Sequence, residues 1–213
     1  MQNNVESLKN DLGLLTPEKF YVKHILKSSN WYFSEYKSLK DKELLESLDL
    51  FKEIVSSNFK VNFYSIKMVG SAKVGFSLSP QKMFKSFGAE DEIGNYSDID
   101  IAIVSDQLYN DYWQGFRDNC NQNYNFPSPK LFKRVSSSIY KGFINDKDIR
   151  EIPEMRKKWD ERADATIANL QRKLLIAHPI TFRLYRNWDD LKEYQLNGIR
   201  ALKNKGESYV SCR

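Results

Sequence analysis

Two aspartates, Asp98 and Asp100, stand two residues apart at the start of an isoleucine-rich run, 99–104. Because side chains along a strand alternate between its two faces, this spacing predicts both carboxylates on one face and the isoleucines on the other. Carboxylate oxygens are ligands that Mg2+ and Mn2+ accept in proteins. The pair therefore predicts half of a Mg2+ or Mn2+ site. Capping of a turn by one aspartate and a solvated strand position for the other is the structural alternative.

A Gly-Ser pair, Gly70 and Ser71, ends an earlier apolar run, 63–69, which is also a predicted strand. Glycine lets the backbone turn tightly, so the N–H groups at the start of the next helix, predicted over 72–77, can face an anion. Lysines near this turn are placed to reach a bound triphosphate, and Lys73 is placed best because it lies within the turn. The others are Lys82 and Lys85.

The ordered combination of a strand, Gly-Ser-x-x-x-Gly and an isoleucine-rich strand opening with Ser-Asp-x-Asp resembles the polymerase-beta-like nucleotidyltransferase superfamily. The resemblance covers about residues 63–105. It implies that the Gly-Ser turn holds the triphosphate of a nucleoside triphosphate and that the Asp-x-Asp pair binds the catalytic metal ions. The residues matched to nucleotide binding are Gly70, Ser71, Gly75 and Ser97, with Lys73 added from its position, and those matched to metal binding and catalysis are Asp98 and Asp100.

Members of that superfamily usually carry a third carboxylate on a later strand beside the pair. The corresponding run here, 180–186, has no acidic residue and carries Arg183 and Arg186 instead, which are candidates for phosphate contacts or for solvated strand residues. Other acids could fold into the site: Asp146, Asp148, Glu151, Asp189 and Asp190. The acidic cluster 90–92, in a long loop predicted over 79–96, is expected to solvate that loop, and contact with the metals is the alternative.

The resemblance implies transfer of a nucleoside monophosphate from a ribo- or deoxyribonucleoside triphosphate to a hydroxyl, with release of pyrophosphate. The favoured product is an oligonucleotide or cyclic nucleotide signal in phage defence, which an effector protein would detect. An enzyme of a toxin–antitoxin system that modifies RNA ends or a protein hydroxyl, and an antibiotic-modifying enzyme, are alternatives. A catalytically silent nucleotide-binding module is the alternative outside the enzyme class.

The composition agrees with a globular protein that binds anions. The chain has 213 residues and a formal net charge of +5, which favours polyanionic partners. Two cysteines and two histidines fit neither a disulfide framework nor a zinc cluster. No apolar run is long enough to span a membrane and the first residues do not form a signal peptide, so a cytoplasmic location is expected.

The periodicity of apolar residues predicts an α+β fold in which several long helices flank a small mixed sheet. Residues 1–60 are expected to form a helical segment packed on a core of residues 61–213, within one compact domain. A helix is predicted to begin at Thr16-Pro17, with Val22, Ile25 and Leu26 on its apolar face and His24 at the core boundary. Further helices are predicted over 38–57, after Ser105, over 130–143, around 159–174 and over 187–203, and a third strand over 180–185.

Overall fold

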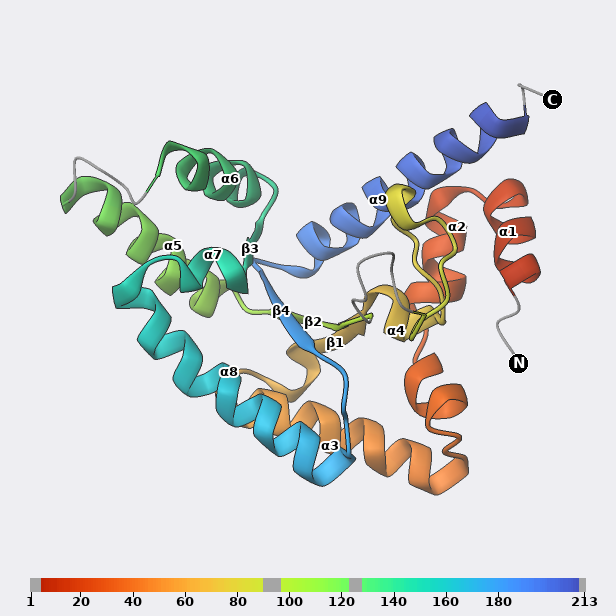
Figure 1. Ribbon diagram of the computed structural model, residues 1–213, viewed down its shortest axis with the longest axis horizontal. Helices are drawn as coiled ribbons and strands as arrows, with labels where there is room; N and C mark the ends of the chain where they lie inside the picture. Colours follow the sequence, from red (N-terminus) through yellow and green to blue (C-terminus); the bar gives the residue numbers. More distant parts are fainter. Residues whose placement is uncertain (1–4, 90–96, 123–127, 211–213) are drawn as a thin grey trace. The chain divides into compact units, whose positions relative to one another are not determined.

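The computed structural model describes residues 5–89, 97–122 and 128–210 (Figure 1). Its contacts divide the chain into two compact units. The first consists of residues 1–48, 68–100 and 192–213, and the second of residues 49–67 and 101–191. The predicted boundary near residue 60 and the predicted single compact domain stay predictions.

The fold is a mixed α+β structure with one small sheet. Strands β1 (Ile66–Val69), β2 (Ile99–Val104), β4 (Ile180–Tyr185) and β3 (Phe143–Asn145) follow one another in that order across the sheet. Strand β3 pairs with β4 in antiparallel register, with Ile144 opposite Leu184. The predicted strands at 99–104 and 180–185 are confirmed, whereas β3 lies where the sequence indicated the end of a helix and a turn.

The first unit contains short helices, the first part of the long helix at residues 41–59 and the later part of another long helix. Besides the helix at residues 41–59, these are α1 (Val5–Leu14), α2 (Pro17–Phe20), the π-helices η1 (Tyr21–Leu26) and η2 (Tyr32–Tyr36), α4 (Gly70–Val74), the 3-10 turn η4 (Pro80–Lys82) and α9 (Trp188–Val210), which begins in the other unit. Their apolar faces form one core, composed of Leu8, Leu12, Phe20, Tyr21, Ile25, Val74, Leu196, Ile199 and Leu202. Residues from three separate chain segments therefore hold this unit together.

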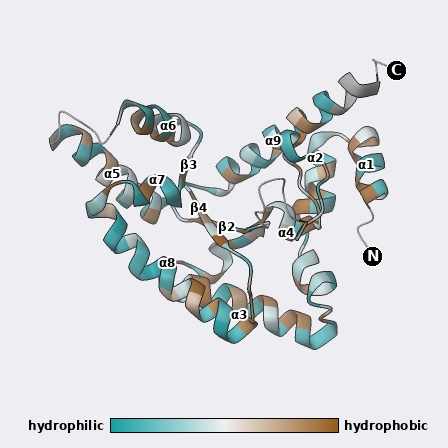
Figure 2. Cartoon of the chain, in the orientation of Figure 1, coloured by the Kyte–Doolittle hydropathy of each residue, from teal (hydrophilic) through white to brown (hydrophobic). Residues whose placement is uncertain are grey.

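The second unit is built around Trp159, which is fully buried. The Trp159 ring lies 5.2 Å from the ring of Phe59 and 5.2 Å from that of Tyr112, measured between centroids. Its helices are the last part of α3 (Asp41–Phe59), the 3-10 turn η3 (Phe63–Ser65), α5 (Asp106–Gln122), α6 (Pro129–Tyr140), α7 (Asp146–Arg150) and α8 (Pro153–Leu174). Hydrophilic and hydrophobic residues alternate along α3 and α8 at helical spacing (Figure 2), as the sequence predicts.

Capping residues begin several helices where the sequence indicates. The Thr16 hydroxyl accepts a hydrogen bond from the N–H of Lys19 at 3.3 Å, and Pro17 occupies the first turn of α2. The Ser105 hydroxyl accepts one from the N–H of Leu108 at 3.2 Å, at the start of α5. Local side-chain chemistry thus determines these helix starts.

The apolar face predicted after Thr16 is wrong in part. Val22 and Leu26 are 47% and 46% exposed, whereas Tyr21 and Ile25 are buried. The chain from Tyr21 to Leu26 forms a π-helix, whose wider turn changes which side chains share a face. The α-helical spacing used for the prediction therefore does not apply to this segment.

Candidate active site

The turn between β1 and α4 carries the first part of the candidate site. Gly70 begins α4 with φ +69°, in the left-handed region that favours glycine. A Cβ atom added to Gly70 would lie 2.3 Å from Oδ2 and 3.2 Å from Cγ of Asp100. Both the torsion and the available space therefore require glycine, and the Gly70 backbone lies directly against the Asp100 carboxylate.

The acid pair carries the second part of the site. Asp98 immediately precedes β2 and Asp100 is the second residue of that strand. Ile99 and Ile101 are fully buried, whereas the two aspartates are only half-buried. Burial thus alternates as predicted over the first residues of the strand, where the carboxylates are the more accessible side chains, whereas Ala102 to Val104 are buried at every position.

Lys73 takes up a different environment from the one its position in the sequence indicated. Its side chain is buried, and its ammonium donates hydrogen bonds to the main-chain carbonyls of Lys27, at 2.6 Å, and Ser29. These bonds compensate the cost of burying an ammonium group. Lys73 therefore ties the segment after η1 to α4, and its contact with a triphosphate stays a prediction.

Gly75 and Ser97 both have structural partners. Gly75 ends α4 in the left-handed conformation, with φ +93°, and an added Cβ would lie 2.8 Å from Nε1 of Trp31. The Ser97 hydroxyl accepts a hydrogen bond from the N–H of Gly88 at 3.2 Å. Packing against Trp31 explains the glycine at position 75, and the Ser97 bond links Gly88 to the residues just before β2. Nucleotide contacts by either residue stay predictions.

No third carboxylate joins the pair within the described residues, where no three acidic, histidine or cysteine side chains gather as a metal site. Two of the candidate acids of the second unit have partners there. Asp148 is fully buried and accepts hydrogen bonds from Arg134 and Asn145, while Asp190 pairs with Arg186 at 2.8 Å. The cluster 90–92 lies outside the described residues.

Arg183 and Arg186, the proposed phosphate contacts in the predicted third strand, also bind protein groups. The Nε of Arg183 donates to Oδ1 of Asn145 at 2.9 Å, and its guanidinium lies 5.3 Å from the centre of the Phe143 ring. The pKa of Asp146, at the start of α7, is raised by burial. Arg183 and Asn145 therefore have each other as partners, as Arg186 has Asp190.

A buried His24–Asp11 pair is a feature that sequence reasoning missed. The structure corrects the boundary position expected for His24, which is 7% exposed and has its Nε2 2.7 Å from Oδ2 of Asp11. Lys23 also contacts Oδ2 of Asp11, at 2.6 Å. The pair joins α1 to η1, and no local pattern indicates it because the chain reverses direction between the two helices.

Comparison with protein-family models, curated proteins and solved structures finds no match. The support for the candidate site therefore comes from the residue types and geometry of this chain. Among the residues that the structure describes, none of the helices combines the length and apolar character needed to cross a membrane.

Proposed function

We propose that this chain is a metal-dependent nucleotidyltransferase of the polymerase-beta-like type. The supporting observation is the close approach of the Gly70 backbone to the Asp100 carboxylate. A phosphate-binding turn and a metal-binding acid pair must be neighbours to act on one triphosphate. The two segments were identified separately, and 30 positions separate Gly70 from Asp100 in the chain.

In this proposal the Ser71 hydroxyl and the backbone N–H groups of the turn bind the β- and γ-phosphates. Asp98 and Asp100 hold Mg2+ or Mn2+, which neutralises charge on the triphosphate and lowers the pKa of the attacking hydroxyl. Two half-buried carboxylates, which the strand spacing predicts on one side, suit such an ion. The acceptor hydroxyl loses its proton to water and its oxygen forms a bond to the α-phosphorus, while the bond from that phosphorus to the β-phosphate oxygen breaks to release pyrophosphate.

The acceptor remains part of the proposal. The favoured acceptor is a second nucleotide. Its product would be an oligonucleotide or cyclic nucleotide that signals to a defence effector. RNA ends, protein hydroxyls and antibiotics are the alternatives that the resemblance leaves open.

A catalytically silent nucleotide-binding module is the second candidate. The observation that favours it is the absence, within the described part of the chain, of a third acid grouped with Asp98 and Asp100. In that case Gly70 and Ser71 would still bind a triphosphate, but no label would be transferred.

The test incubates the purified protein with each α-labelled ribo- or deoxyribonucleoside triphosphate and Mg2+ or Mn2+, and resolves products by size and nuclease sensitivity. Label should appear in an acceptor together with pyrophosphate. Asp98→Asn and Asp100→Asn should lower the rate by orders of magnitude without lowering the melting temperature, since each removes charge and nearly keeps shape. Asp111→Asn, an exposed acid on α5, is the matched control.

Calorimetry with a non-hydrolysable triphosphate measures the binding that both candidates predict, and its comparison with the transfer assay separates them. Ser71→Ala should weaken binding by about 1–3 kcal/mol, the range for a lost hydrogen bond to a charged group. Measurable binding without transfer under any condition would favour the silent module. Metal-dependent transfer that survives both asparagine variants would contradict the proposed metal ligands.

A further inference from the structure

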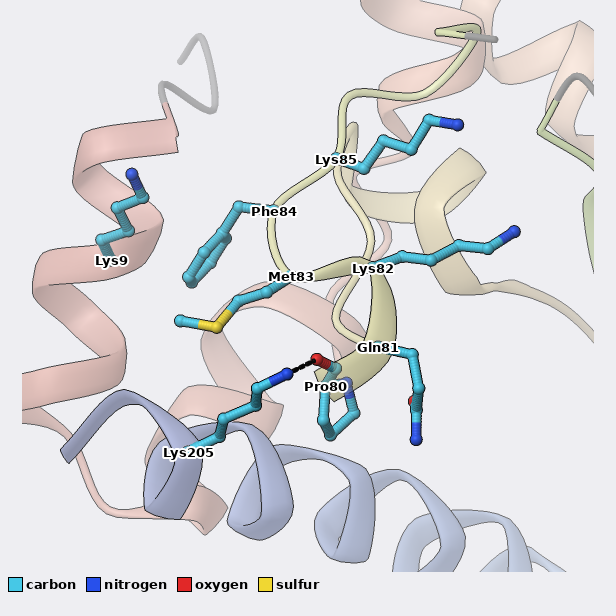
Figure 3. Close-up of a pocket in the computed structure, with 8 residues that line it drawn as sticks. All are labelled: Lys9, Pro80, Gln81, Lys82, Met83, Phe84, Lys85 and Lys205. Atoms are coloured by element: carbon cyan, nitrogen blue, oxygen red, sulfur yellow. Dashed lines mark hydrogen bonds between the residues drawn. The ribbon is translucent and has the colours of Figure 1, made fainter. Parts of the chain in front are cut away.

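A hollow lined by lysines lies on the loop that follows α4 (Figure 3). Its volume is about 560 Å3, within the range of ligand-binding sites in proteins. It lies entirely within the first unit and brings together α1, the loop and α9. The lining residues are Lys9, Pro80, Gln81, Lys82, Met83, Phe84, Lys85 and Lys205.

The loop that carries most of this hollow is held in place. Phe76 and Ser86 form an antiparallel bridge at its base. The ammonium of Lys205 donates a hydrogen bond to the carbonyl of Pro80 at 2.8 Å, which attaches the loop to α9 (Figure 3). Phe84 packs against the core of the unit. The hollow therefore exists before any ligand arrives, which lowers the entropic cost of binding.

The charged side chains that line the hollow are all positive. Four of its lining residues are lysines and none is acidic. Lys9 lies over the Phe84 ring at 5.5 Å and Lys205 bonds to a carbonyl, and neither partner carries a compensating charge. Among the described residues, none of the four lysines forms an ion pair with a carboxylate. Such a concentration of positive charge attracts anions.

The lysines do not converge on one point. Figure 3 shows Lys82 and Lys85 extending to the same side of the loop, whereas Lys9 and Lys205 come from the helices on its other side. A single phosphate cannot contact charges spread in this way, but a chain of phosphates can. The half-buried apolar side chains of Met83 and Phe84 lie on the same side of the loop as Lys9 and Lys205, and their exposed parts offer surface to bases.

We propose that this hollow binds a short stretch of single-stranded nucleic acid, whose backbone phosphates contact the four lysines. An acidic peptide would satisfy the charges but has no use for the apolar surface beside them. The proposal is independent of nucleotidyl transfer, because none of the lining residues belongs to the turn or to the acid pair.

The test measures binding of an end-labelled, unstructured 12-nucleotide RNA or DNA by fluorescence anisotropy, without nucleoside triphosphate or metal. Four phosphate contacts predict that log K falls with log salt concentration with a slope of about −2.8. Lys82→Glu/Lys85→Glu should weaken binding by about tenfold or more and reduce the slope to about half, since two contacts are lost.

The matched control is Lys40→Glu/Lys192→Glu, which changes two exposed lysines elsewhere in the same unit and lowers the net charge of +5 by the same amount. It should bind within about twofold of the original protein. Equal loss in both double variants would mean attraction by overall charge alone and would overturn the site. Competition by polyglutamate of equal charge, as strong as by unlabelled oligonucleotide, would overturn the nucleic-acid assignment, as would no binding at all.

Discussion

Gly70 is the residue that brings the backbone of the candidate site against the Asp100 carboxylate. Its φ of +69° disfavours any other residue, and its Cα faces the Asp100 carboxylate. Gly70→Ala must therefore strain the turn and displace Asp100. We expect a loss of about 1–3 kcal/mol in the free energy of unfolding, measured by urea titration, and loss of metal-dependent activity.

Gly198→Ala is the matched control for this change. Gly198 lies inside α9, and an added Cβ meets nothing within 4 Å. Alanine in a helix interior should keep or raise the free energy of unfolding, by up to about 1 kcal/mol. Equal effects of the two substitutions would show that neither the Gly70 torsion nor its contact with Asp100 matters.

The sequence predicts what individual residues do when the cause is local. The alternation that buries Ile99 and Ile101 and leaves Asp98 and Asp100 accessible follows from strand geometry alone. The burial of Lys73 does not, because its carbonyl partners come from more than 40 positions earlier in the chain. The spacing of residues along the chain cannot predict the role of a side chain when that role depends on a segment distant in the sequence.

At the scale of elements, the α1–η1 contact makes stability depend on pH. Burial lowers the pKa of His24, and this effect exceeds the opposing effect of the Asp11 carboxylate. A histidine in the unfolded chain has a pKa of about 6.5. Below that pH the unfolded chain takes up a proton that the folded protein does not, so the free energy of unfolding falls as the pH decreases.

Urea midpoints at about pH 7.5 and 5.5 check this expectation. The midpoint of the original protein should be lower at the acidic pH, and His24→Gln should reduce the difference. His178→Gln, at the only other histidine, should leave it unchanged. A pH dependence that persists in full after His24→Gln would assign it to other groups.

The elements themselves are predicted unevenly. Helices α5 and α8 and strands β2 and β4 follow from periodicity and caps. The π-helices η1 and η2 do not, because hydrophobic spacing is interpreted with 3.6 residues per turn. Strand β3 has only three residues, and its pairing with β4 rather than its own pattern defines it.

At the scale of the molecule, the first unit depends on contacts between the two ends of the chain. Leu202, in α9, is fully buried in the same core as Leu8 and Phe20. Leu202→Ala should lower the free energy of unfolding by about 2–5 kcal/mol, with hydrogen exchange increased in α1 and α2. Leu14, in the same unit, is 84% exposed, so Leu14→Ala should change the free energy of unfolding by less than about 0.5 kcal/mol.

Unaltered exchange in α1 and α2 after Leu202→Ala would contradict a core shared by both chain ends.

The sequence indicates the apolar faces of these helices but not their partners. Pairing between segments nearly 200 positions apart depends on the path of the whole chain, which no window of residues contains.

The burial of Lys73 has a further consequence for chemical modification. An amine-acylating reagent reacts with accessible lysines such as Lys82 in the native protein, but it reaches Lys73, which is 5% exposed, only when the surrounding structure opens. The acylation rate of Lys73, followed by mass spectrometry, therefore reports how often the segment around α4 unfolds. Acylation would also remove the charge that binds the carbonyls of Lys27 and Ser29, so a molecule acylated during an opening would be marked irreversibly.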